Sequence, residues 1–212
     1  MKKLAKKAQN PAHLFLLLNI EALLVLLATK TFGALPMTVF CALLLFLLPY
    51  FPQTFDIQLS TTLEFLITLL LFGSLVLGES FDFYYQIRFW DDALHTLAGF
   101  LFGACGAFLF WERKGLGAIS FALFGSSLWE IFEFIGDRLF GTNMQKDSII
   151  KPPLLSSQPQ PNVGGVDIGL ADTMLDLCFG LLGGALFLLL VYFACSSIGE
   201  QLLIKHSRKD SQ

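Results

Sequence analysis

Six long blocks of apolar residues constrain this chain more than any other feature of its sequence. They cover about residues 14–29, 34–51, 61–77, 93–110, 116–135 and 173–194. Each block approaches the roughly 20 residues with which an α-helix crosses a hydrocarbon layer about 30 Å thick. The whole chain is 55% hydrophobic and only 15% charged, unlike an ordinary soluble domain. We therefore predict an all-α, polytopic integral membrane protein with about six transmembrane helices, in which residues 1–212 form a single membrane domain.

The first apolar block follows the basic segment MKKLAKK, an arrangement that also occurs in secretory signal peptides. Asn19 and Glu21 interrupt this block, and no Ala-x-Ala cleavage site follows it. We therefore expect an uncleaved first span.

The distribution of lysine and arginine predicts the orientation, because cytoplasmic loops carry an excess of these residues. With the N-terminus inside, the outer segments hold five of the 14 basic residues and the inner segments hold the other nine. The inner set is Lys2, Lys3, Lys6, Lys7, Arg113, Lys114, Lys205, Arg208 and Lys209, and the outer set is Lys30, Arg88, Arg138, Lys146 and Lys151. We predict that both termini are cytoplasmic.

The last three apolar blocks carry ionisable residues at helical spacing. The pairs are Asp91 and His95, Glu130 and Glu133, and Asp172 and Asp176. Residues three or four apart lie on the same face of a helix, so each block has a polar stripe. The fourth and sixth blocks begin outside and the fifth ends outside. At a rise of about 1.5 Å per residue, all three stripes are predicted to lie within about 10 Å of the outer surface.

Some of these acids have a simpler structural interpretation. Asp91, Asp92 and Asp172 could cap helix N-termini, where the helix dipole favours negative charge. Asp137 could be a solvated helix end. Glu130 and Glu133 fit this interpretation poorly because they fall in the C-terminal half of their block. A buried carboxylate costs several kcal/mol unless it is protonated, paired or bound to a cation.

Carboxylates with one imidazole suit a divalent ion such as Zn, Mn, Fe or Mg better than Cu. Helical bundles build metal sites from inward glutamates and Glu-x-x-His pairs, but this chain lacks the second histidine of the di-iron pattern. One divalent ion and a proton network without metal both fit. In the metal interpretation the ligands come from Asp91, His95, Glu130, Glu133, Asp172 and Asp176, and the catalytic residues are His95, Glu130 and Glu133.

Three further features lead to structural expectations. Two groups of glycines are expected to allow close packing of the fourth and sixth spans: Gly99, Gly103 and Gly106, and Gly180, Gly183 and Gly184. All four cysteines fall inside apolar blocks or, for Cys195, directly after one, which predicts small hydrophobic residues rather than a disulfide scaffold. The outer loop at 141–169 is rich in Pro, Ser, Gln and Gly, and is interpreted as a flexible linker or a cover for the site.

The polar motifs also resemble those of a known family. The pattern is Asp91-x-x-x-His95-x-x-x-Gly99-Phe100, then Glu130-x-x-Glu133, then Asp172-Thr173-x-x-Asp176. It resembles the YjdF-like group of bacterial inner-membrane proteins, a domain of unknown function, over roughly residues 89–190. A fainter likeness is to VanZ-like proteins, which also open a span with an aspartate four residues before a histidine. Both resemblances imply a small multi-pass protein of the bacterial cytoplasmic membrane, and neither implies a settled reaction.

Three functional hypotheses follow. The first is a divalent-metal-dependent enzyme with an outward-facing site, which acts on a lipid or envelope precursor by metal-activated water or general acid–base chemistry. The second is a proton- or metal-coupled transporter, and the third is a non-catalytic structural membrane protein. The expected partner is membrane lipid, and no nucleic acid is expected. A transporter should extend polar residues across the bilayer, whereas the inner half offers little beyond Glu21 and Glu64.

Overall fold

The structure is a computed structural model that describes residues 11–54, 57–140, 143–145, 168–193 and 205–206. The chain divides into two compact units, one of residues 1–97 and 189–212 and the other of residues 98–188. We name them the N-terminal unit and the C-terminal unit, and we describe each by itself. Their union in the single membrane domain predicted from the sequence stays a prediction.

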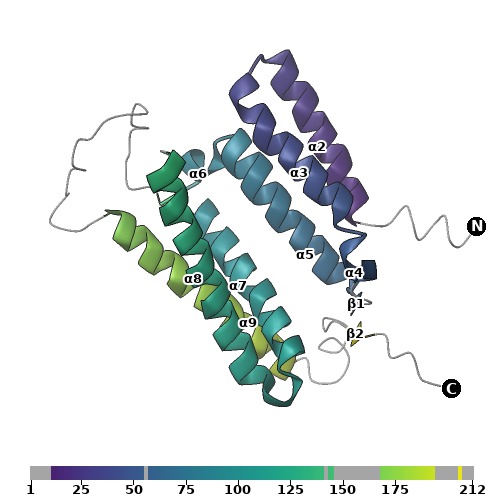
Figure 1. The fold of residues 1–212 in the computed structure, drawn as a ribbon, viewed down its shortest axis with the longest axis vertical. Helices are drawn as coiled ribbons and strands as arrows, with labels where there is room; N and C mark the ends of the chain where they lie inside the picture. The colour runs from purple at the N-terminus through teal and green to yellow at the C-terminus, as the bar shows by residue number, and fades with distance from the viewer. Residues whose placement is uncertain (1–10, 55–56, 141–142, 146–167, 194–204, 207–212) are drawn as a thin grey trace, which may run out of the picture. The chain divides into compact units, whose positions relative to one another are not determined.

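The N-terminal unit consists mainly of apolar helices. In chain order its elements are α2 (Pro11–Ala28), η1 (Phe32–Ala34), α3 (Leu35–Leu47), α4 (Phe51–Thr54), β1 (Ile57–Gln58), α5 (Thr61–Phe72), the π-helix η2 (Gly73–Ser80), α6 (Phe83–Gln86) and the first turns of α7 (Trp90–Leu109). The two-residue strand β1 pairs antiparallel with β2 (Lys205–His206). Figure 1 shows α2, α3 and α5 side by side in this unit.

Aromatic packing holds these helices together. The Phe15 ring of α2 lies edge-on to Phe65 and Phe72 of α5, with centroid distances of 5.7 and 5.6 Å. At the end of η2, the Ser80 hydroxyl lies 2.8 Å from the Thr38 hydroxyl of α3. This buried hydrogen bond satisfies two polar groups that would otherwise destabilise an apolar core.

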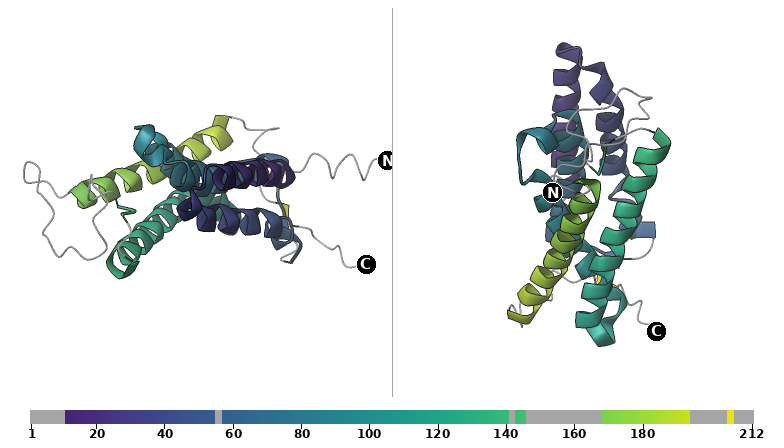
Figure 2. Two further views of the ribbon diagram at one scale, coloured as in Figure 1. Left: turned by 90° about the horizontal axis from the view of Figure 1, so that it is seen from above. Right: turned by 90° about the vertical axis from the view of Figure 1, so that its left-hand side faces the viewer.

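The C-terminal unit contains the rest of α7, η3 (Trp111–Arg113), α8 (Lys114–Phe140) and α9 (Ile168–Phe193), whose last residues belong to the N-terminal unit. The α8–α9 pair is visible in both views of Figure 2. Glycines bring α7 and α9 into backbone contact. A Cβ atom at Gly99 would collide with the carbonyl oxygen of Gly180, and one at Gly103 would lie 3.1 Å from Gly184 Cα. The predicted glycine packing is confirmed at these two pairs.

Small residues also line the two contacts made by α8. Gly106 of α7 lies against Gly117 of α8 rather than against α9. A Cβ atom at Gly184 would lie 2.6 Å from the Ala122 side chain, and one at Gly180 would collide with Ser126. Small residues at helix crossings are the usual means by which membrane helices approach closely.

Five described helices are long and apolar enough to cross a membrane: Pro11–Ala28, Thr61–Ser80, Trp90–Leu109, Lys114–Leu139 and Gly169–Val191. They correspond to five of the six predicted spans. The second predicted span, 34–51, is the shorter apolar helical segment Phe32–Leu47. It ends there because Pro49 has no N–H with which to continue the helical hydrogen bonds. The multi-pass, all-helical class is confirmed, whereas the cytoplasmic termini stay a prediction. Most of the 141–169 loop lies outside the described residues.

Candidate functional site

The register of α8 against α9 positions their acidic residues. Ala122 lies against Gly184, and Ser126 against Gly180, so the two helices run antiparallel. One helical turn beyond these contacts, the residue number is about four higher on α8 and about four lower on α9. The next polar residues reached on the two helices are Glu130 and Asp176.

Glu133 of α8 is buried and has a hydrogen-bond partner for only one of its two carboxylate oxygens among the described residues. Its side chain is 6% exposed. Its Oε1 atom accepts a hydrogen bond of 2.7 Å from the Trp129 indole N–H, one turn earlier on α8. The other oxygen, Oε2, is buried and has no hydrogen-bond partner among the described residues. Three further carboxylates, those of Glu130, Asp172 and Asp176, lie within electrostatic range of Glu133.

Glu130 links the two helices. It is 4% exposed, and its carboxylate interacts with the Thr173 hydroxyl of α9 and with the charge of Asp172. The Gln145 side-chain amide in turn donates a 3.0 Å hydrogen bond to Thr173. Asp176 is 1% exposed. The C-terminal unit therefore contains four neighbouring carboxylates, of which Glu130, Glu133 and Asp176 are buried. We call these four residues the acidic cluster.

The remaining two predicted ligands lie in the N-terminal unit. Asp91 and Asp92 are in the first turn of α7, and His95 follows one turn later. The His95 Nε2 atom lies 3.7 Å from Asp91 Oδ1, and His95 is 7% exposed. The predicted shared face of Asp91 and His95 is therefore present. Their convergence with the acidic cluster stays a prediction.

Two acids differ from their simplest structural interpretation. Helix α9 begins at Ile168, five residues before the predicted span, so Asp172 lies in its second turn and is not an N-cap. Asp137 is not merely a solvated helix end. Its two carboxylate oxygens accept hydrogen bonds from the backbone N–H groups of Met144 and Gln145, at 2.8 and 3.0 Å. These hydrogen bonds hold residues 144–145 against the last turns of α8.

The sequence reasoning missed three members of the site. Trp129 stands four residues before Glu133, so helical spacing was a signal for their contact. Thr173 belongs to the polar motif, but nothing in the sequence indicated that its hydroxyl faces Glu130. Gln145 comes from a connecting segment, where side-chain partners have no periodic signal.

Comparison with known proteins places this chain in a family. The family model described as "Predicted membrane protein (DUF2238)" matches residues 12–197. The chain belongs to this family. It is also similar to an uncharacterised protein of Thermotoga maritima, with 33% identity over 118 residues, which are 51% of this chain and 50% of the relative. The match thus spans about half the length of that curated relative. No solved structure matches the chain.

Proposed function

We propose that this membrane protein holds one divalent cation at its acidic cluster and uses it to act on a lipid or envelope precursor. The observation that carries the proposal is Glu133, a buried carboxylate with one oxygen lacking a hydrogen-bond partner among the described residues and three other carboxylates around it. A divalent ion bound to these oxygens would offset their mutual repulsion and their loss of water.

His95 is proposed as the nitrogen ligand, with Asp91 beside it. Helix α7 is continuous, and its Gly99 and Gly103 pack on Gly180 and Gly184 of α9. Both helices advance one turn in about four residues. The turn preceding these contacts is therefore expected to hold His95 on α7 and Asp176 on α9. Asp91, His95 and Asp176 together supply one imidazole and two carboxylates, a donor set suited to a divalent ion.

The chemistry proposed for the site is hydrolysis or group transfer. A bound divalent ion would polarise an oxygen of the substrate or activate a water molecule. The carboxylate oxygens of Glu133 and Glu130 that do not bind the ion would then hold or move a proton, and the contact with Asp91 would orient His95 as a ligand. We place this protein in the bacterial cytoplasmic membrane, as its resemblance to the YjdF-like group implies. Substrate contact is proposed at the outer side.

A transporter is the second candidate. The distribution of polar residues favours the enzyme, since a transport path requires polar groups across the bilayer. Beyond the acidic cluster, the helix contacts of the C-terminal unit are made by residues such as Gly103, Ala118 and Phe187, none of which can carry a proton or a cation. A site confined to one end of the bundle suits a reaction at the membrane surface.

Metal analysis of the purified full-length protein tests the proposal. The wild type is loaded with Mn, Zn, Fe or Mg, freed of excess ion, and compared with the double variant Glu130→Gln/Glu133→Gln. We expect one ion per chain in the wild type and a loss of at least about tenfold in affinity in the variant, because carboxylate ligands supply the compensating charge. Glu112→Gln, at an exposed acid of η3, is the matched control. A folded wild type that binds none of the four ions would refute the proposal.

A further inference from the structure

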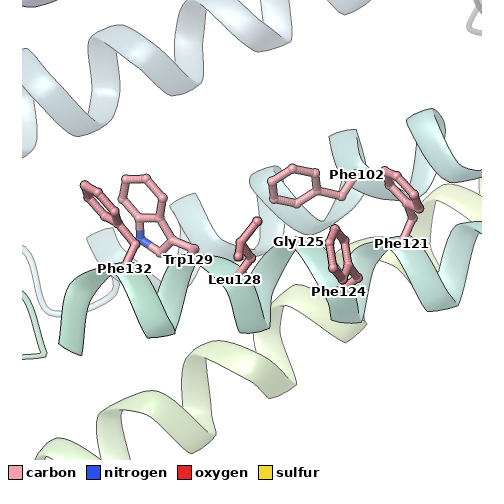
Figure 3. A pocket seen from close by; sticks show the side chains of 7 residues that line it. All are labelled: Phe102, Phe121, Phe124, Gly125, Leu128, Trp129 and Phe132. Carbon is pink, nitrogen blue, oxygen red and sulfur yellow. The ribbon is translucent and has the colours of Figure 1, made fainter. Parts of the chain in front are cut away.

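The C-terminal unit has an apolar groove beside the acidic cluster. It has a volume of about 290 Å³ and is lined by Phe102, Phe121, Phe124, Gly125, Leu128, Trp129 and Phe132. Figure 3 shows Trp129 and Phe132 at one end and Phe102, Phe121 and Phe124 at the other. All lining residues but Phe102 belong to α8. Their span of residues 121–132 corresponds to roughly 16 Å along the helix, so the groove extends over about three helical turns.

We propose that this groove binds one acyl chain of a membrane phospholipid. The lining is hydrocarbon and aromatic, and the groove lies along a helix that is long and apolar enough to cross the membrane. Phe124, Leu128 and Phe132 are 58, 55 and 58% exposed. In the hydrocarbon layer the surrounding medium is lipid tails rather than water. The shape of the groove therefore suits a single extended chain.

Shape rather than hydrophobicity has to hold the chain, because lipid tails are as apolar as the leucine side chains of the protein. Dispersion contacts with the closely packed rings provide this preference. Gly125 keeps the floor of the groove low, because a Cβ atom there would lie 2.5 Å from the Phe102 ring. The rings of Trp129 and Phe132 form a tilted pair with a centroid distance of 5.5 Å at one end.

Trp129 connects the groove to the proposed site. Trp129 lines the groove, and its indole N–H donates to the Glu133 carboxylate at 2.7 Å. A lipid whose tail lies in the groove would thereby bring its headgroup end toward the acidic cluster. The groove thus identifies a phospholipid as the substrate class, an inference that rests on the proposed function.

Photolabelling of the purified full-length protein tests the groove. The probe is palmitate with a diazirine on its chain, and the labelled peptides are mapped by mass spectrometry. We expect labelling concentrated at residues 121–132, with competition by phospholipid. Gly125→Leu should reduce that labelling about tenfold, because the new side chain fills the groove. Gly115→Leu is the control, since a Cβ atom at Gly115 meets nothing within 4 Å.

A second pair of variants tests the groove even if Gly125→Leu fails to fold. Phe124→Ala removes an exposed wall of the groove and should also lower labelling, whereas Ile131→Ala, at an equally exposed position of α8 outside the groove, should not. Labelling spread evenly over all apolar helices would overturn the proposal. Competition by a polyprenyl phosphate but not by phospholipid, or cross-linking of two chains through this face, would overturn the choice of occupant.

The two proposals fail separately. Labelling of the groove in a protein that binds no divalent ion would leave the acyl-chain site in place and refute the metal site. A metal-loaded protein that is not labelled at residues 121–132 would leave the metal site in place and refute the acyl-chain site.

Discussion

The Trp129 indole N–H donates a 2.7 Å hydrogen bond to the Glu133 carboxylate, and this contact joins an apolar groove to a buried acid. It fixes the orientation of Glu133, because only one of the two carboxylate oxygens has a donor among the described residues. Partners that orient a metal ligand from outside commonly change metal affinity by about 10–100-fold when they are removed. Trp129 is therefore a positioning residue in the proposed site.

The first prediction concerns this hydrogen bond. Trp129→Phe keeps an aromatic ring in the groove but removes the N–H group. We expect the affinity for Mn to fall by about tenfold or more, as measured by calorimetric titration of the purified protein. Unchanged Mn affinity in a folded variant would contradict the role of Trp129.

Trp90→Phe is the matched control. The Trp90 indole N–H also donates to an oxygen, the backbone carbonyl of Gly73, at 3.1 Å in the N-terminal unit. Losing this bond should lower stability by about 0.5–1.5 kcal/mol. Metal affinity should stay unchanged.

The second prediction concerns pH. Protons and the divalent ion compete for the His95 imidazole and for the carboxylates. Mn affinity should therefore fall as the pH is lowered, because a protonated imidazole or carboxyl group cannot bind the ion. In His95→Gln the affinity should already be lower at high pH, because one ligand of the ion is missing.

His13→Gln, at an exposed histidine of α2, is the control and should behave as the wild type does. A Mn affinity at high pH that is identical in the wild type and in His95→Gln would exclude His95 as a ligand.

Much of the architecture could be predicted from the sequence because a membrane helix must be long and apolar. Five predicted spans match described helices of sufficient length. The pairing of Glu130 with Glu133 on one helix face follows from their spacing, and both are buried as expected. These features depend on local periodicity, which the sequence displays directly.

Features that depend on the partner helix were harder to predict. Gly106 was expected to pack on the sixth span, yet it lies against Gly117 of α8. Asp172 resembled a cap because the apolar block begins at residue 173, although α9 starts at Ile168. The apolar groove had no signal at all. Its lining combines one residue of α7 with six of α8. Apolar and aromatic residues spaced as these six are along α8 occur in any membrane helix, so they gave no indication of a groove.

The third prediction concerns helix packing. Gly99→Val places a branched side chain against the backbone of Gly180, where not even a Cβ atom fits. Overpacking of this kind typically costs about 1–3 kcal/mol. We expect a lower midpoint of thermal unfolding and weaker Mn binding, because a displacement of α7 at Gly99 would also displace the preceding turn, which contains the proposed ligand His95.

Gly115→Val should leave both quantities close to the wild-type values, since there is space around Gly115. If Gly99→Val has the same midpoint of thermal unfolding as the wild type, the α7–α9 contact adds nothing to stability.

The last prediction concerns the side of the membrane on which the acidic residues lie. The excess of basic residues in the inner segments predicts that the η3 turn faces the cytoplasm and that the 141–169 loop faces outward. Activity-reporter fusions after Lys114 and after Pro153 should therefore read inside and outside, respectively. Fusions after Lys30 and Arg88 are expected to read outside and provide internal controls. If the Lys114 and Pro153 fusions read the same side, α8 does not cross the membrane. The His95 end of α7 and the Glu133 end of α8 would then lose the common level that the proposed metal site requires.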